Sequence, residues 1–355
     1  MPADRPRVFR LTSRPTALRV AAVVAVLAMA LAAQPGPVST AVAPTANPLA
    51  GGPWPHSTLA TKANPELRNH LAASGTRRKA LARIALTPRV RWIANCPACN
   101  VATVRRIVAD HVADTRRNNP DALVQLAIFG LWPDGQVVRG KRPRMSWSMA
   151  RYQRWVRQIA AGIGDARVVI VLEPDLAISA NHGADGRTMP DPTPGIRMRM
   201  TAWAARYLSS TLRRESIYID AGSADWLYVD EAVRLLRASG IEHVRGFALG
   251  ATHYDSVAHN VAFAAKVSTA LAHSGIRGKR AVIDTADNGT PFTWAQWNAR
   301  WGDRFRRTGN LHYQFDNTPT CGSRAERVCQ TLGHRPTWNP LGAEASKLGE
   351  MYAAV

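Results

Sequence analysis

The sequence predicts an α/β protein whose parallel strands form a barrel. Apolar runs of strand length recur from residue 90 onward, and segments with helical periodicity separate them. The runs are residues 90–94, 123–130, 168–174, 217–222, 244–250 and 280–285. They are almost continuously hydrophobic, which is typical of strands covered on both faces. Repeated strand–helix units give a parallel sheet with right-handed crossovers. With six or seven strands, we favour a closed or nearly closed barrel over a doubly wound open sheet.

The segments between the runs show the spacing of amphipathic helices. Two apolar stripes follow it: Val104, Ile107, Val108, His111 and Val112, and then Tyr152, Trp155, Val156 and Ile159. Gly240 occupies a helix C-cap position before the run at 244–250. No G-x-G-x-x-G follows the first run, which argues against a dinucleotide-binding domain.

The first residues of the chain differ from the rest. Five arginines accompany an apolar run at residues 20–33, which is too short to cross a bilayer comfortably. Because the sequence AVA at residues 41–43 fits a cleavage site, we interpret residues 1–43 as a signal peptide and expect a secreted protein. A non-cleaved membrane anchor is the alternative. We expect no membrane contact after cleavage.

The remainder of the chain reads as one domain with an N-terminal extension. Residues 44–75 are rich in Pro, Gly and Asn, so we expect an arm that wraps the domain formed by residues 76–355. The formal net charge of the chain is +21, which favours contact with polyanions. Because the arginines are scattered and no aromatic-interleaved basic block is present, we favour a solvated basic surface and expect no nucleic-acid partner. The sequence does not predict an oligomeric state.

The chain contains four cysteines, Cys96, Cys99, Cys321 and Cys329. An even number in an exported protein favours disulfides, and three pairings are possible. The C-x-x-C spacing of the first two would suit a redox dithiol or half a zinc site inside a cell. Export argues against both of these alternatives.

Acidic residues collect where the predicted strands end. They are Asp134, Glu173, Asp175, Asp220, Asp284 and Asp287, the last followed by Asn288. Catalytic groups of parallel barrels lie at these strand ends, and paired carboxyls suit glycosidic cleavage. Four tryptophans near the same ends could stack on sugar rings: Trp92, Trp132, Trp226 and Trp338. The sequence has no close histidine pair, G-x-S-x-G or Walker loop, so we expect neither a metal nor another cofactor.

Several stretches, in this order, resemble a known family. They are NPLAG, VATVRRIVADHVAD, IAAGIGDARVVIVLEPDLAI, IYIDAGSADWL, LLRASGIEHVRGFALG, VIDTADNG and CGSRAERVCQTLGHRPT. The chain is similar to glycoside hydrolase family 6, which contains endoglucanases and cellobiohydrolases. The resemblance implies a distorted, incomplete barrel of about seven strands. It also implies hydrolysis of β-1,4-glucan with inversion.

The resemblance assigns roles to individual positions. Asp175 matches the general acid of the family's E-P-D motif, and Asp220 matches a sugar-binding acid. Trp226 matches a nearby stacking residue, and Trp92 matches a residue of a distal subsite. Asp134 is a shifted candidate for the acid that assists catalysis. The predicted substrate-binding set is completed by His253, Tyr254 and Asn288.

The sequence also departs from the family pattern. Both asparagines of one family motif are absent where His253 and Tyr254 stand, and the loop that bears the family's proposed base is missing. We therefore expect a divergent hydrolase of β-glucan or an anionic glycan. A glycan- or cell-wall-binding protein without turnover is the alternative.

The resemblance further implies a cysteine pairing. Cys321 matches a family position whose partner lies in the missing loop. Cys329 could replace that partner, leaving Cys96 and Cys99 to close their own short loop. The alternative pairing joins the two cysteine-bearing loops to each other.

Overall fold

The structure is a computed structural model in which residues 47–49, 53–60, 64–94, 96–131, 148–179, 195–251, 253–308 and 318–336 are described. All of them belong to one compact unit, Ala43–Val355. Asp134, Trp132 and Trp338 lie outside the described residues, so their predicted roles remain predictions.

Six parallel strands form one sheet in sequential order. They are β1 (Arg91–Ala94), β2 (Val124–Phe129), β3 (Val168–Leu172), β4 (Glu215–Asp220), β5 (Gly246–Leu249) and β6 (Arg280–Ile283). In the described part of the chain β1 pairs only with β2 and β6 only with β5, so the barrel does not close. The predicted incomplete parallel barrel is confirmed, with six strands described where about seven were expected.

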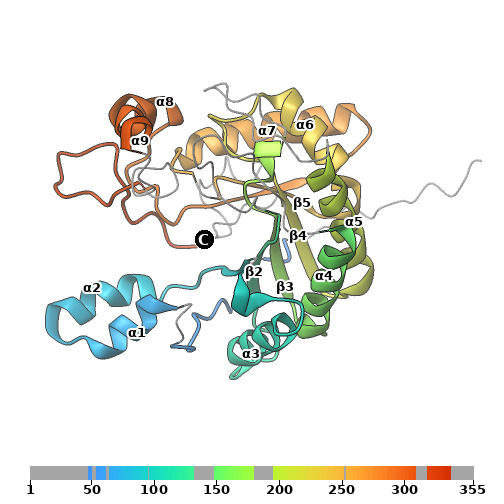
Figure 1. Cartoon of the computed structure of the whole chain (residues 1–355), viewed down its shortest axis with the longest axis horizontal. Coiled ribbons are helices and arrows are strands. Elements are labelled where there is room, and N and C mark those ends of the chain that lie inside the picture. The colour runs from blue at the N-terminus through green and yellow to red at the C-terminus, as the bar shows by residue number, and fades with distance from the viewer. Residues whose placement is uncertain are drawn as a thin grey trace, which may run out of the picture. The chain divides into compact units, whose positions relative to one another are not determined.

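Helices follow the strands and cover the outer face of the sheet (Figure 1). The α-helices are α1 (Pro65–Ala72), α2 (Gly75–Ala85), α3 (Val104–Arg116), α4 (Met149–Ile163), α5 (Ile196–Thr211), α6 (Val229–Ala238), α7 (Val257–His273), α8 (Trp294–Trp297) and α9 (Asp303–Thr308). Shorter helical turns are η1 (Pro97–Cys99), η2 (Leu176–Ser179), η3 (Ile241–His243) and η4 (Asn298–Gly302). Caps fix several starts: the Ser148 hydroxyl accepts from the Arg151 N–H, and the Ser256 hydroxyl accepts from the His259 N–H. None of the described helices is long and apolar enough to cross a bilayer.

The alternation of side chains along each strand separates two cores. In β3, Val168, Ile170 and Leu172 pack outward against the helices. Val169 and Val171 point to the interior, where they meet side chains of β2, β4, β5 and β6. Since both faces of the strand are buried, every position must be apolar, which explains the uninterrupted hydrophobic run.

Close strand contact at one position requires glycine. A Cβ placed on Gly246 would lie 1.8 Å from the backbone oxygen of Arg280, its neighbour in β6. Any side chain at this position would therefore displace β5 from β6. The C-terminal ends of β5 and β6 lie at the same edge of the barrel, which we call the rim.

The segment before α1 packs against the domain. The Leu123 N–H donates to the Pro53 oxygen at 3.1 Å. The Asp114 carboxylate, at the end of α3, accepts from the Thr58 N–H at 2.8 Å and from the Ser57 hydroxyl at 3.2 Å. Leu49 is completely buried in the interior core. These contacts hold residues 47–49 and 53–60 against the N-terminal ends of the strands.

Candidate active site

The turn after β3 carries Asp175 in an unusual backbone conformation. Asp175 has φ 65° and Glu173 has φ 55°, both in the left-handed region that non-glycine residues seldom adopt. The Leu176 N–H donates to the Glu173 oxygen at 3.0 Å, which closes the turn. The Asp175 side chain is buried, with 6% of its surface exposed. The turn thus presents one carboxyl from a tightly folded four-residue segment.

Asp220 lies beside Asp175 at the end of β4. Its Oδ2 accepts from the backbone N–H groups of Ala177 and Gly222, each at 3.3 Å. Burial raises the pKa of the Asp220 carboxyl well above its usual range, and the neighbouring Asp175 carboxyl raises it further. The structure therefore brings together two of the acids that the sequence singles out, and the Asp220 carboxyl keeps its proton to a higher pH than in water.

The buried carboxylate of Glu173 holds this turn through hydrogen bonds. Its carboxylate accepts hydrogen bonds from the backbone N–H groups of Gly130 and Leu131 and from the Tyr152 hydroxyl. Burial is the largest cause that raises the pKa of Glu173, to about 7, against the opposing effect of these donors. The sequence indicates Glu173 as a strand-end acid but does not reveal this network, because Tyr152 appears there only as part of an apolar helical stripe.

Trp226, after β4, and His253, after β5, stack on each other. Their rings stack with centroids 4.3 Å apart and an interplanar angle of 22°. Burial lowers the pKa of His253 to about 4, although the Asp225 carboxylate nearby acts in the opposite sense. The Asp225 Oδ2 accepts from the Trp294 N–H at 2.6 Å, whereas its Oδ1 is buried without a hydrogen-bond partner in the described part of the chain. Sequence reasoning missed Asp225 because it stands in a loop, five residues beyond the end of β4.

Trp92 lines a small cavity inside the barrel. Its ring meets Phe129 edge-on, with centroids 5.2 Å apart. Pro174, next to Asp175, and Asp284, at the end of β6, line the same cavity. Burial and the neighbouring Asp287 raise the pKa of Asp284 well above its usual range, and the Asp287 carboxylate accepts from the Gln330 side chain at 2.8 Å. The cavity therefore joins the predicted distal tryptophan to the rim that carries the acids.

Tyr254 packs against a separate aromatic core. Its ring stacks on Phe292 with centroids 4.7 Å apart, and only 1% of the residue is exposed. Its predicted role in substrate binding stays a prediction. Asn288 is also buried, and its Nδ2 donates to the Asp255 oxygen at 2.9 Å. This bond links the segment after β6 to the loop after β5, and the predicted role of Asn288 in substrate binding stays a prediction.

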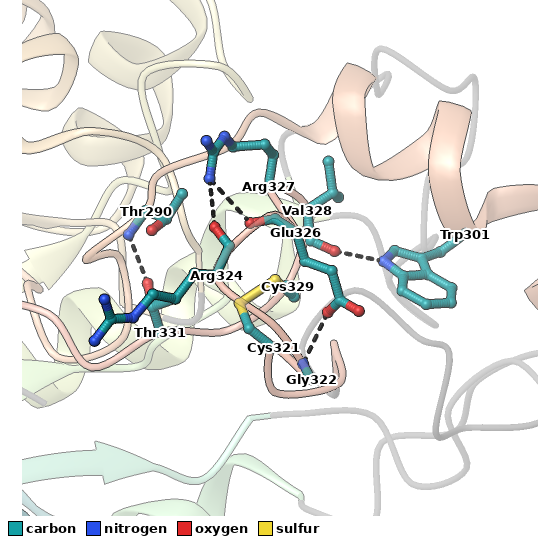
Figure 2. Close-up of a disulfide and its surroundings, with 10 residues drawn as sticks. All are labelled: Thr290, Trp301, Cys321, Gly322, Arg324, Glu326, Arg327, Val328, Cys329 and Thr331. Carbon is teal, nitrogen blue, oxygen red and sulfur yellow. Dashed lines mark hydrogen bonds between the residues drawn. A yellow bond between two sulfur atoms is a disulfide. The ribbon is translucent and has the colours of Figure 1, made fainter.

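A disulfide joins Cys321 to Cys329, as the resemblance implied. Figure 2 shows the loop that it closes next to Trp301, whose indole N–H donates to the Val328 oxygen at 2.8 Å. Thr331 follows the disulfide, and its hydroxyl accepts from the Thr290 N–H. The disulfide loop is thereby attached to the chain segment that follows β6.

The other two cysteines also lie side by side. The Sγ atoms of Cys96 and Cys99 are 2.6 Å apart, without a bond between them in the structure. Their predicted pairing stays a prediction. The Trp155 indole N–H donates to the Cys99 oxygen at 2.7 Å, so the pair belongs to the start of α3 and its packing.

Comparison with known proteins agrees with this geometry. The sequence model of glycosyl hydrolases family 6 matches residues 52–309. Endoglucanase A of Cellulomonas fimi is 34% identical over 218 residues, which is 61% of this chain and 43% of that protein. Endoglucanase A of Thermobispora bispora is 28% identical over 61% of this chain and 44% of its own length. The matched region therefore spans less than half of these two relatives.

Solved structures share the fold. An endoglucanase of Mycobacterium tuberculosis, in complex with a thio-cellobioside ligand, has a TM-score of 0.62 at 22% identity, over 87% of this chain and 89% of that one. Cellobiohydrolase II of Humicola insolens, in complex with glucose and cellotetraose, has a TM-score of 0.60 at 16% identity, over 87% and 85%. At these identities the likeness establishes the barrel architecture. Since the family model covers most of the chain and the acids lie at the expected strand ends, the chain belongs to glycosyl hydrolases family 6.

Proposed function

We propose that the protein is a secreted glycoside hydrolase that cleaves β-1,4-glucan-type polysaccharide with inversion of configuration. The observation that carries the proposal is the buried pair of carboxyls, Asp175 and Asp220, at the ends of β3 and β4. A buried carboxyl beside a second carboxyl holds its proton above the usual pH range. A protonated carboxyl beside a glycosidic bond is the group that such a reaction needs.

Asp175 acts as the general acid in this proposal. Its proton passes to the glycosidic oxygen while the bond between that oxygen and the anomeric carbon breaks. Water attacks the anomeric carbon from the opposite face, and a carboxylate takes the proton that the water releases. We assign that role to Asp134, which stands in the loop after β2, with Asp220 as the acid that orients the sugar.

Trp226 and Trp92 supply the binding surface. The half-buried indole of Trp226 is held in place by its stack on His253. Trp92 is also half-buried and provides the second aromatic surface. The endoglucanase relatives and the sugar-bound structural neighbours support a β-glucan as the substrate.

Release of reducing ends tests the proposal. Wild type and Asp175→Ala would be compared on a panel of β-glucans and anionic polysaccharides. We expect release by wild type and a loss of several hundredfold or more in the variant, because a positioned general acid contributes about 10²–10⁴-fold.

A second candidate is a glycan-binding protein without turnover. The net charge of +21 and the missing stretch that bears the family's proposed base favour it. In that case both proteins would bind a polysaccharide in the same panel, and neither would release reducing ends. Release by wild type alone excludes this candidate.

A further inference from the structure

We propose that Glu173 is a positioning residue for Asp175. Its hydrogen bonds attach the turn that carries Asp175 to residues 130–131, directly after β2. The inference rests on the proposed function of Asp175 as the general acid. It concerns a residue that would not contact substrate. Three observations support the proposal: the contacts of Glu173, the backbone of the turn and the position of Asp220.

The carboxylate of Glu173 joins three elements. Its Oε2 accepts from the N–H groups of Gly130 at 2.9 Å and Leu131 at 2.8 Å, directly after β2. Its Oε1 accepts from the Tyr152 hydroxyl of α4 at 2.7 Å. Glu173 is only 1% exposed and Tyr152 is fully buried. Hydrogen bonds in such a shielded place are strong and directional.

The backbone of the turn is anchored at the same point. The Glu173 N–H donates to the Ile128 oxygen at 2.8 Å, which extends the β2–β3 ladder by one residue. Main chain and side chain of Glu173 therefore both bind the end of β2. Because its main chain and its side chain are both bound, Glu173 has little freedom to rotate. Its orientation therefore sets the direction of the two peptide units that follow.

Asp220 fixes the other end of the turn. Its carboxylate accepts from the Ala177 N–H at 3.3 Å, two residues beyond Asp175. The acid is thus placed between two buried carboxyl groups, one toward β2 and one on β4. Left-handed non-glycine residues cost about 1–3 kcal/mol each and persist only when their surroundings hold them. Glu173 and Asp220 are the groups that hold Asp175 at φ 65°.

The hydrogen bonds of Glu173 argue against a direct catalytic role. Three donors occupy both of its carboxylate oxygens, so neither oxygen is left to meet a sugar. The remaining question is whether the network serves stability alone or also the placement of Asp175. A purely stabilising role leaves kcat unchanged once it is corrected for the folded fraction, whereas a positioning role lowers the corrected kcat.

Two substitutions of Glu173 separate the roles. Glu173→Gln keeps an oxygen for the two backbone donors, and its amide can donate to the Tyr152 hydroxyl, which rotates to accept. Glu173→Ala removes all three acceptors. Asp114→Asn is a matched control, because Asp114 is a buried carboxylate that accepts from backbone and hydroxyl donors at the opposite ends of the strands.

Steady-state kinetics on the substrate that wild type cleaves, corrected for folded fraction, give the test. We expect Glu173→Ala to lose about 10- to 100-fold in kcat, because small misplacements of a reacting group cost this much. KM should change by less than about twofold, since ground-state binding is untouched. Glu173→Gln should recover most of kcat, and Asp114→Asn should lose stability but not kcat. Equal kcat in Glu173→Ala and Asp114→Asn would overturn the inference.

If wild type shows no turnover, the proposed function is refuted but the positioning role of Glu173 is not. Crystal structures of the variants then test that role. We expect the turn at residues 173–177 to relax in Glu173→Ala, with Asp175 leaving the left-handed region. In Glu173→Gln the turn should stay as it is. An unchanged turn in Glu173→Ala would show that Glu173 does not position the acid.

Discussion

Glu173 and Asp220 place carboxyl groups where water hardly reaches them. Burial of a charged group is costly, so each of these residues favours its protonated form, and the pKa of each is raised. Hydrogen-bond donors offset part of this cost for the ionised form. The rim of the barrel is therefore a place where acids keep their protons at higher pH than in water.

The titration of Glu173 predicts a pH-dependent stability. Its folded pKa, about 7, lies above the ordinary value of 4.5, so its stabilising contribution is complete below about pH 4.5 and is lost as the pH rises through 7. Glutamine does not titrate. Relative to Glu173→Gln, wild type should lose about 1.4 kcal/mol of unfolding free energy for each unit between the two pKa values. Urea unfolding of both proteins at pH 4.5, 6 and 8 checks this, and a difference that is independent of pH would contradict it.

His253 offers a second test at the residue scale. Burial beneath the Trp226 indole lowers the pKa of His253 to about 4. Trp226→Ala should admit water and raise the pKa toward the unperturbed value of about 6.5. An NMR titration of the His253 ring protons measures this change. The control is Tyr228→Ala, since Tyr228 is 78% exposed and forms no part of the stack. A pKa that stays near 4 in Trp226→Ala would show that other groups exclude the water.

Among the elements, the disulfide loop is attached to the strand end of β6 by several contacts. Besides Thr331, two backbone groups attach it to the strand end: the Gly333 N–H donates to the Ala286 oxygen at 2.7 Å, and the His334 N–H donates to the Thr285 oxygen at 2.8 Å. Gln330 adds a contact to Asp287. The loop therefore orders the segment that carries Asp284 and Asp287.

Removal of the disulfide should loosen this loop selectively. A crosslink across so short a loop contributes roughly 2–3 kcal/mol in the chain-entropy description. In the double variant Cys321→Ser with Cys329→Ser, amide hydrogen exchange should accelerate at Gln330 and Gly333. The amides of β3 should keep their protection, because the sheet does not depend on the loop. Unchanged exchange at Gln330 and Gly333 would mean that the surrounding contacts suffice.

The β5–β6 pair gives a prediction about the sheet. Gly246→Ala would place a Cβ 1.8 Å from the Arg280 oxygen, so the strands must separate. We expect a loss of at least about 3 kcal/mol in unfolding free energy, at the upper end of overpacking effects. Gly75→Ala is the matched control: its Cβ meets nothing, and its φ of 54° costs only about 1–2 kcal/mol. Denaturant unfolding compares the two, and equal losses would contradict the close contact.

At the scale of the molecule, the sequence predicts the sheet and much of the rim. Each of the six apolar runs overlaps a strand of the structure, because continuous hydrophobicity is the direct consequence of burial on two faces. Asp175 and Asp220 could be recognised since strand ends of a parallel barrel converge. The acidic residues that follow the apolar runs and the convergence of parallel strand ends both indicated Asp175 and Asp220.

The remainder depends on contacts between distant segments. The bond from Tyr152 to Glu173 joins α4 to β3, and nothing in the helical stripe distinguishes an apolar ring from a donor. Tyr254 lies beside His253 in sequence, yet one ring stacks at the rim and the other enters the core. The backbone direction after β5 decides this, and that direction is not encoded by residue type.

General acid catalysis by Asp175 is the claim on which the proposed function depends. The most direct measurement compares wild type with Asp175→Ala on a cello-oligosaccharide and on a cellobioside with a dinitrophenyl leaving group. A good leaving group departs without a proton. We therefore predict a loss in kcat/KM of several hundredfold or more on the oligosaccharide and a much smaller loss on the activated substrate. Equal losses on both substrates would contradict the assignment of Asp175 as the acid.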